Sequence, residues 1–329
     1  NKKYFKIAKR LNKNKKIIIH NNFDKLSKIF PKKIDYVMSS IVGLDGLMPT
    51  YKIIKFTKKI AIANKESIIC AWNLIKKELT KHKTEFIPVD SEHFSIWYAL
   101  RNNSTNNIRK LYLTASGGPL LNVPLNKYKK LKVKKIVNHP NWKMGPKISV
   151  DSCTMINKIF EIIEAKKIFN LKYNQLSILI HPKSYVHSII KFRDGMIKII
   201  AHDTTMKIPV FNTLNKLSFD KLTSNEIDLY KLNNLELTKI NHKKFPVVNI
   251  INKLPNRDSL YETVLVSTND ELVKLFLSKK ISYSQMLLRL LNLISQKELL
   301  KYKSIEPKKI NDILKINKII RSKINHDEN

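Results

Sequence analysis

Two carboxylates stand two residues apart in the segment Pro88–His93, directly after a short apolar run. If the strand continued through this segment, Asp90 and Glu92 would share one of its faces, because alternate residues of a strand point the same way. Carboxylates held side by side repel each other unless a cation lies between them, and their hard oxygen atoms suit Mg²⁺ or Mn²⁺. A solvated strand end is the alternative interpretation, and the segment taken alone favours it.

A second candidate site lies at the start of a helix that we predict from about residue 154 to residue 169. Ser152 or Thr154 can cap this helix, which leaves backbone N–H groups free to face an anion. Glu164 is expected to have only an ordinary structural role. Three side chains share one face, since they are three or four positions apart: Asn157, Lys158 and Glu161. This set is suited to holding a phosphate and supplying a third metal ligand; a capped amphipathic helix with an internal Lys–Glu pair is the alternative.

Two loops combine glycine with polar or aromatic side chains, Ser116–Pro119 and His139–Gly145. Adjacent glycines, in a chain with only six, allow close approach to a ligand or form a tight turn. Trp142 and Met144 lie between a proline and a glycine, as in a mobile lid that excludes water. An exposed turn with the tryptophan packed on the core is the competing interpretation.

A further polar segment, Asn64–Ser67, follows a predicted strand and opens a predicted helix. This position is the carboxyl end of a parallel strand, where open α/β sheets bind their ligands. An ordinary helix N-terminus is the alternative.

Short apolar runs alternate with helical stretches through the first ninety residues, which predicts a parallel βαβ sheet able to hold a dinucleotide. The predicted strands are Lys16–His20, Asp35–Val42, Lys59–Ala63 and Glu85–Val89. The predicted helices are Phe23–Phe30, Met48–Phe56 and Ser67–His82. A Gly-x-Gly-x-x-Gly turn is absent from the sequence, so we expect it either upstream of Asn1 or missing from the protein.

Four regions follow from the pattern, and the fold class we predict is α/β. Strands are expected to dominate from Phe86 to about Val210, and helices from about Phe245 to Ile324. The regions are a partial, Rossmann-like dinucleotide-binding domain with a parallel sheet (1–85), an α+β catalytic and metal-binding domain (86–210), a connection (211–241) and a C-terminal helical bundle (242–329).

The composition narrows the classes of function. The 62 basic residues against 26 acidic ones give a formal charge of +36, but the charge is mostly lysine and is spread along the chain. Arginine, which reads bases and grips phosphates, is scarce, so we expect no nucleic-acid partner. No apolar run approaches the roughly 18 to 20 residues that span a bilayer, so no membrane segment is expected. Two cysteines, Cys70 and Cys153, fit a reducing compartment.

In this order and spacing, the segments resemble the 1-deoxy-D-xylulose 5-phosphate reductoisomerase family. The resemblance covers nearly the whole chain, and its long central run is the most specific part. The matching runs are Asp35–Pro49, Ala63–Ser67, Pro88–His93, Leu113–Pro119, His139–Lys158 with Glu161, and His181–Ser188.

The resemblance implies an enzyme that uses NADPH and a divalent metal, Mg²⁺ or Mn²⁺. The implied reaction rearranges and reduces 1-deoxy-D-xylulose 5-phosphate to 2-C-methyl-D-erythritol 4-phosphate, in non-mevalonate isoprenoid precursor biosynthesis. The partner it implies is a small-molecule phosphosugar substrate. It further implies that NADPH binds to the Rossmann-like domain and that the protein is a homodimer. A bacterial cytoplasm is the implied compartment, with a plastid-type organelle as the alternative.

The resemblance also implies a role for each matching residue. The metal ligands are Asp90, Glu92 and Glu161. The catalytic residues are Lys65, Glu92 and His139. The substrate contacts are Ser91, Ser116, His139, Ser152, Asn157, Lys158 and Glu161. The cofactor contacts are Asn64, Lys65, Glu66, Met144 and Gly145. His93 and His187 match family histidines without a role of their own.

Some positions depart from the family pattern, among them Pro146 in the loop and the segment His202–Thr205, where the family has Gly-x-Pro-Asp. None of the departures removes a predicted ligand. Three alternatives stay open: a diverged relative with another substrate, a basic nucleic-acid-binding protein, and a remnant of the fold kept for dimerisation without catalysis.

Overall fold

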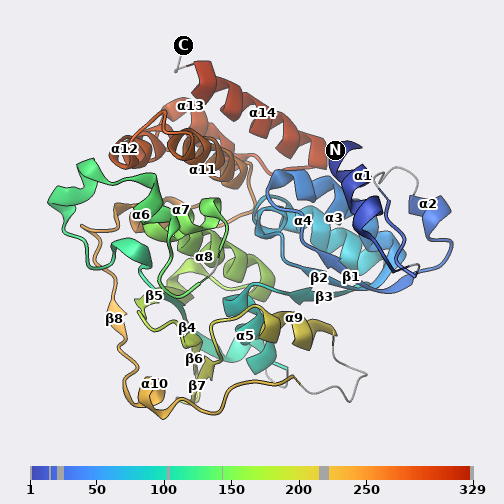
Figure 1. The fold of residues 1–329 in the computed structure, drawn as a ribbon, viewed down its shortest axis with the longest axis horizontal. Coiled ribbons are helices and arrows are strands. Elements are labelled where there is room, and N and C mark those ends of the chain that lie inside the picture. The colour runs from blue at the N-terminus through green and yellow to red at the C-terminus, as the bar shows by residue number, and fades with distance from the viewer. Residues whose placement is uncertain are drawn as a thin grey trace.

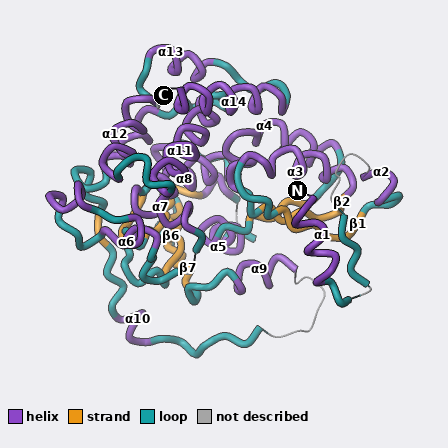
Figure 2. The backbone as a smooth tube through the Cα atoms, turned by 45° about the horizontal axis from the view of Figure 1, so that its top comes forward, coloured by secondary structure: helices purple, strands orange, loops and turns teal. Residues whose placement is uncertain are grey.

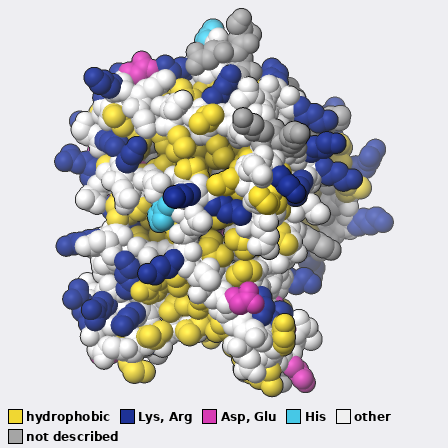
Figure 3. Space-filling model, turned by 90° about the vertical axis from the view of Figure 1, so that its left-hand side faces the viewer, with side chains coloured by type: hydrophobic (Ala, Val, Ile, Leu, Met, Phe, Trp, Pro, Cys, Tyr) yellow, Lys and Arg dark blue, Asp and Glu magenta, His cyan; other side chains and the backbone are white. Residues whose placement is uncertain are grey.

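The computed structural model describes residues 2–14, 16–20, 26–101, 104–142, 144–214 and 222–326, without the side chains of 2–4, 129 and 130. Two sheets lie in the lower part of the view in Figure 1, and the C-terminal helices lie above them. Among the described residues, no helix is both long and apolar enough to span a bilayer. Lys and Arg side chains are scattered over the face in Figure 3 and form no single basic stripe there.

The first sheet is parallel and has the order β1-β2-β3. Its strands are β1 (Ile34–Ser39), β2 (Thr57–Ile62) and β3 (Glu85–Pro88), and its connections contain α3 (Leu47–Ile53) and α4 (Lys65–Lys81). Ile60 and Ile62 of β2 belong to the main core, whereas Ala61 packs in a small second cluster with Trp97 and Val210. Both faces are therefore covered, as parallel sheets require.

The second sheet is mixed and has the order β7-β6-β4-β5-β8, with β4 and β5 parallel and the other pairs antiparallel. Its strands are β4 (Ile108–Ala115), β5 (Leu176–Ile180), β6 (Val186–Phe192), β7 (Ile197–Ala201) and β8 (Thr238–Lys239). Helix α5 (Ser91–Ala99) contacts β3 of the first sheet and β6 and β7 of the second. The N-terminus of α5 therefore lies where the two sheets meet.

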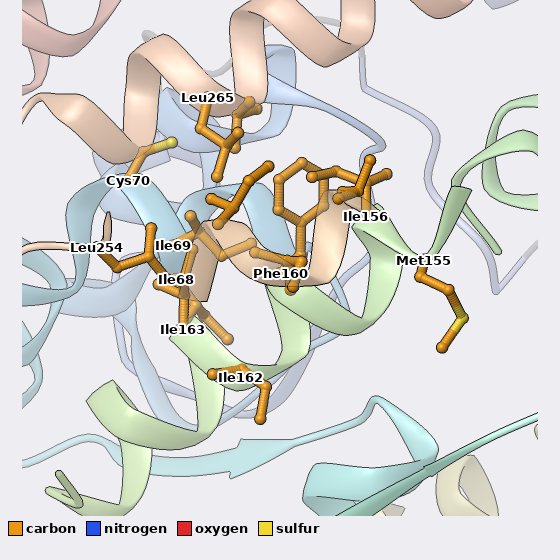
Figure 4. Packing of buried hydrophobic residues seen from close by; sticks show 14 of the residues in the cluster. Ile68, Ile69, Cys70, Met155, Ile156, Phe160, Ile162, Ile163, Leu254 and Leu265 are labelled. Atoms are coloured by element: carbon orange, nitrogen blue, oxygen red, sulfur yellow. The ribbon is translucent and has the colours of Figure 1, made fainter. Parts of the chain in front are cut away.

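Helix α8 (Ile156–Phe169) is the central element of the core, and α7 (Pro146–Thr154) precedes it. Figure 4 shows Phe160 and Ile163 of α8 packed against Ile68 and Ile69 of α4, with Leu265 of the C-terminal region above. Each fully buried side chain of this size contributes about 1.5–3 kcal/mol through the hydrophobic effect. Polar side chains on a helix buried on all faces need partners, and Asn157, Lys158 and Glu161 of α8 find them in the candidate site.

The C-terminal region is a helical layer that covers α4 and α7 (Figures 1 and 2). Its helices are α11 (Tyr261–Leu277), α12 (Tyr283–Leu293), α13 (Lys297–Leu300) and α14 (Ile310–His326). Ser282 caps α12 in a capping box with Gln285, a sequence signal for a helix start. The remaining helices are α1 (Lys2–Leu11), α2 (Leu26–Ile29), α6 (Val133–Val137), α9 (Lys207–Leu214) and α10 (Leu229–Asn233).

Three predictions about elements are wrong in part. The predicted strand Lys16–His20 is a loop, in which Ile17 and Ile18 are 55% and 76% exposed, because no described strand pairs with it. Strands do not dominate after Phe86, since α5, α6, α7 and α8 all lie there. Of the predicted helix Phe23–Phe30, only Leu26–Ile29 is helical, and residues 23–25 lie outside the described residues.

Candidate active site

A cavity of about 260 Å³ lies between the C-terminal edge of the first sheet, the second sheet and the start of α8. Most of the predicted site residues line it: Lys65, Asp90, Ser91, Glu92, Ser116, His139, Met144, Ser152, Asn157, Lys158 and Glu161. The predicted cofactor residues Asn64, Glu66 and Gly145 are not among its lining residues. The cavity is also lined by Trp142, Ser184, His187 and Met206, the last of which no sequence pattern singles out.

Three carboxylates converge in this cavity, as predicted. Asp90, Glu92 and Glu161 each present a ligand oxygen, and these atoms all lie within 4.8 Å of one another. The reason predicted for the convergence is wrong, because the strand ends at Pro88 and Asp90 occupies the N-cap position of α5. Glu92 therefore comes from the first turn of a helix, and Glu161 reaches it from the facing helix α8.

The protonation behaviour of the carboxylates fits a cation site. Burial and the neighbouring charge of Glu92 raise the pKa of Glu161 to about 8. Burial acts in the same direction on Glu92, but the Lys158 ammonium outweighs it and lowers the pKa of that carboxyl. Three charges so close together are unfavourable without positive countercharge, and hard oxygen ligands suit Mg²⁺ or Mn²⁺. The residues present therefore fit a divalent metal.

Two lysines contact the carboxylate cluster, one from α4 and one from α8. Lys65 Nζ lies 2.6 Å from Asp90 Oδ2 and donates to Asn157 Oδ1 at 2.8 Å. Lys158 Nζ lies 2.6 Å from Glu92 Oε1 and also pairs with Glu161, the neighbour predicted on its helix face. Burial opposes the charged form of both lysines, but the carboxylates outweigh it and raise both pKa values, so both side chains stay cationic.

Glu164, for which the sequence predicts an ordinary helix role, is a buried part of this cluster. Its side chain is 1% exposed, and its Oε2 lies 3.6 Å from Nδ1 of the equally buried His93. His93 Nδ1 also lies 3.8 Å from Asp90 Oδ2. Asp90, His93 and Glu164 therefore form a second group of possible metal ligands, which has Asp90 in common with the first. The only signal in the sequence is the setting of Glu164 between the apolar residues Ile163 and Ala165, in a helix that is apolar at most positions.

The other end of the cavity is organised around His139. Its Nδ1 accepts the backbone N–H groups of Asn141 at 3.2 Å and Trp142 at 3.1 Å, so the ring proton is on Nε2. Nε2 therefore donates to Ser116 Oγ at 3.0 Å, which in turn accepts the N–H of Gly118 at 3.1 Å. Burial lowers the pKa of His139 to about 4, which keeps the ring neutral.

The adjacent glycines of the Ser116 loop are required by its geometry. Gly117 and Gly118 have φ values of 80° and 64°, in the left-handed region. A Cβ atom on Gly118 would lie 3.2 Å from Cα and 3.3 Å from the nitrogen of Cys153. The loop can therefore lie directly on α7 only with a glycine at this point.

The start of α8 differs from the predicted single helix. Met155 adopts a left-handed conformation, with φ 66°, and divides α7 from α8. Ser152 and Thr154 both lie inside α7, and the N-cap of α8 is Met155, which makes no side-chain cap, so neither predicted cap is correct. Thr154 Oγ1 does accept the N–H of Ile156 at 3.3 Å next to the break. The break turns Ser152 and Lys158 toward the same cavity.

Three rings form a wall beside the cavity. Trp142 makes an edge contact with His187, with centroids 6.1 Å apart, and His187 stacks on His202 at 3.7 Å. His187 Nε2 donates to the carbonyl oxygen of His202 at 3.2 Å, and burial lowers the pKa of His187 to about 3. Trp142 is thus part of the cavity wall, and His202, at a position where the chain departs from the family pattern, supports it.

The segment Asn64–Ser67 begins with a helix cap, as its alternative interpretation predicts. Asn64 Oδ1 accepts the N–H of Ser67 at 2.8 Å at the start of α4, directly after β2. Glu66 is 5% exposed and is held by Asn64 and by Lys147. Together, a parallel α/β sheet and a carboxylate triad in a lysine-containing cavity define an α/β enzyme with a metal-dependent active site.

Comparison with known proteins agrees with this class. Residues 1–72 match the sequence model of 1-deoxy-D-xylulose 5-phosphate reductoisomerase, residues 86–169 match that of its C-terminal domain, and residues 203–323 match that of the DXP reductoisomerase C-terminal domain. A relative from Pelagibacter ubique (strain HTCC1062), named 1-deoxy-D-xylulose 5-phosphate reductoisomerase, is 56% identical over 97% of this chain and 83% of its own length. A relative of the same name from Sulfurihydrogenibium sp. is 34% identical, over 79% of this chain and 68% of its own.

Solved structures point to the same family. A crystal structure of DOX-P reductoisomerase in complex with NADPH, fosmidomycin and magnesium has a TM-score of 0.85 and 31% identity, and covers 98% of this chain and 82% of that one. The Zymomonas mobilis enzyme in complex with NADPH has a TM-score of 0.80 and 28% identity, over 93% and 78%. The chain belongs to the 1-deoxy-D-xylulose 5-phosphate reductoisomerase family, and its predicted family and fold class are confirmed.

Proposed function

We propose that this protein converts 1-deoxy-D-xylulose 5-phosphate to 2-C-methyl-D-erythritol 4-phosphate, with NADPH as reductant and a divalent metal. The observation that carries the proposal is the convergence of Asp90, Glu92 and Glu161 beside the buried cation of Lys158. A carboxylate triad next to a cationic, hydroxyl-lined cavity suits a substrate with a phosphate at one end and adjacent oxygens at the other.

The phosphate end of the substrate is assigned to the part of the cavity lined by Ser116, Ser152, Asn157 and Lys158. His139 holds the hydroxyl of Ser116 by donating to it, so the neutral imidazole orients an anion contact and leaves the cavity charge unchanged. Binding energy at this end restrains the substrate while bonds change elsewhere.

The reacting end is assigned to the carboxylate triad and to Ser91 and Lys65. A metal held by the triad, Mg²⁺ or Mn²⁺, supplies Lewis-acid polarisation of substrate oxygens when bound. Lys65, which is cationic beside Asp90, is placed to donate a hydrogen bond to a developing negative charge. Trp142 and Met144, which line the same cavity, exclude water from it.

The nicotinamide cofactor supplies hydride for the reduction when bound. The residues that we assign to it are Asn64, Lys65, Glu66, Met144 and Gly145, which flank the carboxyl end of β2 and the start of α7. Asn64 and Glu66 are held in place by hydrogen bonds and by Lys147.

Substrate identity is tested by comparing 1-deoxy-D-xylulose 5-phosphate with related ketose phosphates in an NADPH-oxidation assay with Mg²⁺ or Mn²⁺. The proposal expects 1-deoxy-D-xylulose 5-phosphate to have the highest kcat/KM and to yield the branched polyol phosphate. A higher kcat/KM with another ketose phosphate would replace it with a diverged activity on the same site.

We further propose that the protein is a homodimer. The edge strand β7 exposes Ile197 and Ile199 (52% and 49%), and the segment near α10 exposes Ile227, Leu229 and Tyr230 (70%, 65% and 72%). An uncovered edge strand with apolar side chains is a pairing surface that a second copy can bury. Light scattering of the purified protein tests this, and a monomer mass across the micromolar range would contradict it.

The bacterial cytoplasm is the compartment that we propose. Cys70 and Cys153 are both buried free thiols, and burial raises both pKa values. Such thiols persist unoxidised in a reducing compartment. Fractionation of the source cells checks this placement.

A further inference from the structure

A second ionic cluster lies outside the candidate active site, around Lys147 near the start of α7. Its ammonium nitrogen lies 2.9 Å from Asp151 Oδ2, 3.1 Å from Asp270 Oδ1 and 3.4 Å from Glu66 Oε1. These carboxylates come from α7, α11 and α4, and each side chain is at most 8% exposed. One lysine is therefore the shared counter-ion of three buried carboxylates from three helices.

Polar contacts extend the cluster in two directions. Toward the first sheet, Glu66 Oε2 accepts from Asn64 Nδ2 at 3.3 Å, and the same amide donates to the carbonyl oxygen of Gly43 at 2.9 Å. This path reaches the turn that follows β1.

Toward the C-terminal layer, Asp151 Oδ1 accepts from Asn269 Nδ2 at 2.8 Å, and Asp270 Oδ2 lies 3.7 Å from Arg321 Nη2 of α14. The cluster therefore connects the first sheet, the loop that ends at Gly145 and the C-terminal helices.

The positive charge of Lys147 stabilises this arrangement. Three carboxylates in a buried position repel one another, and burial raises the pKa of Asp270 to about 6. Burial opposes the charge of Lys147 as well, but the surrounding carboxylates outweigh it and raise the pKa of the ammonium. If the lysine were removed, the remaining charges would be left buried without a partner, which favours separation of the three helices.

The position of Lys147 gives the cluster a functional meaning. It lies directly after Pro146, at the end of the loop that contains Met144 and Gly145, and its partner Glu66 directly follows Lys65. We propose that Lys147 is a positioning residue that holds this loop at a fixed position relative to the segment Asn64–Glu66, which we assign to the cofactor. The link to the cofactor rests on the proposed function, whereas the positioning itself does not.

Hydrogen–deuterium exchange on the protein tests the positioning without any ligand. Two amides report it, Gly46 bonded to the carbonyl of Gly43 and Ser149 bonded to that of Gly145. Lys147→Met is expected to raise exchange about tenfold in the peptides that contain both amides, because both segments lose their common anchor. Lys147→Arg, which keeps the positive charge, is expected to restore exchange to within about twofold of the wild-type rate.

Lys167 provides the matched control. It is 3% exposed and lies 2.7 Å from Asp258 Oδ1 and 3.2 Å from Glu262 Oε1 of α11. Its contact with α4 is to the carbonyl oxygen of Ile69, at 2.8 Å, outside the segment Asn64–Glu66. Lys167→Met removes the same charge from a similar cluster. A rise of equal size at Gly46 and Ser149 in this control would overturn the proposal, as would a rise confined to the Ser149 peptide in Lys147→Met.

If Lys147→Met does not fold, Asp270→Asn, which keeps the lysine and removes one carboxylate, takes its place. Increased exchange at both reporter amides supports the proposal, and unchanged exchange at Gly46 overturns it. The dissociation constant of NADPH, measured by protein fluorescence, tests the link to the cofactor. Lys147→Met is expected to weaken NADPH binding about tenfold or more, and Lys167→Met less than twofold. If the wild type bound no NADPH, the proposed function would fail, while the exchange result would still decide the positioning role.

Discussion

Lys158 Nζ lies 2.6 Å from Glu92 Oε1, and this contact joins the first turn of α5 to the first turn of α8 across 66 residues of sequence. The lysine thus holds two of the three proposed metal ligands, since it pairs with Glu161 as well. Because its side chain also lines the cavity, one residue contacts both the metal site and the space assigned to the phosphate.

Replacing Lys158 with Met is expected to reduce kcat/KM for 1-deoxy-D-xylulose 5-phosphate by roughly 10- to 100-fold. A hydrogen bond to a charged group contributes about 1.5–3 kcal/mol, and the variant loses at least one such contact to the phosphate. Steady-state kinetics with the substrate varied at saturating NADPH measures the change. Lys110→Met, which removes an exposed lysine bonded to the carbonyl of Asn174, is the control and should retain wild-type kinetics; equal kinetics for the two variants would remove Lys158 from the substrate site.

His139 predicts a specific pH dependence of stability. Burial lowers its pKa from 6.5 to about 4, so the folded protein binds fewer protons than the unfolded chain between these values. Burying the neutral imidazole therefore costs no proton-binding free energy above pH 6.5. As the pH falls toward 4, the unfolded chain gains a proton that the folded protein does not, so the free energy of unfolding decreases. His139→Asn has an oxygen to accept the loop N–H groups but does not titrate, so its Tm should fall less between pH 7 and pH 4.5. Parallel Tm curves for the two proteins would show that the imidazole is not the titrating group.

Gly118→Ala is expected to destabilise the protein by about 2 kcal/mol or more. The left-handed backbone disfavours a side chain, and the new Cβ would press on the backbone of Cys153. Gly195 has a φ of 92°, but no described atom lies within 4 Å of the position that a Cβ would take there, so Gly195→Ala measures backbone strain alone. In urea unfolding, the loss in the free energy of unfolding should be larger for Gly118→Ala; equal losses would show that the close approach to α7 is not important.

Glu164→Gln is expected to weaken divalent-metal binding about tenfold, because groups that support a ligand typically change affinity by 10- to 100-fold. The change removes a buried negative charge beside His93 and Asp90 while keeping the shape of the side chain. Titration with Mn²⁺ measures the affinity. The exposed Glu298→Gln is the charge-matched control and should bind as the wild type does; unchanged affinity in Glu164→Gln as well would limit the site to the three carboxylates.

The sequence predicts the residues of the site better than it predicts their geometry. Helix periodicity alone predicts that Asn157, Lys158 and Glu161 share one face of the helix, and their contacts within α8 confirm this. Strand alternation predicts that Asp90 and Glu92 lie on one side, but the chain begins helix α5 at this point. No local pattern in the sequence indicates that the strand ends before Asp90.

Buried charges are the least predictable features. The apolar neighbours of Glu164 indicate that it is buried but not what it contacts, and Lys147 has no such signal. The partners of both residues come from helices that meet only in the folded protein. The segment Lys16–His20 has the apolar pattern of a strand, but it is a loop with exposed apolar side chains. An apolar run does not form a strand unless another strand is available to pair with it.

The central claim is that Asp90, Glu92 and Glu161 bind one divalent cation. Mn²⁺ binding to the purified protein, followed by the electron paramagnetic resonance signal of the free ion, tests it without reference to turnover. We expect one tight site per chain in the wild type, and loss of that site in Asp90→Asn and in Glu161→Gln with far-UV circular dichroism unchanged. Wild-type Mn²⁺ affinity in either folded variant would contradict the account.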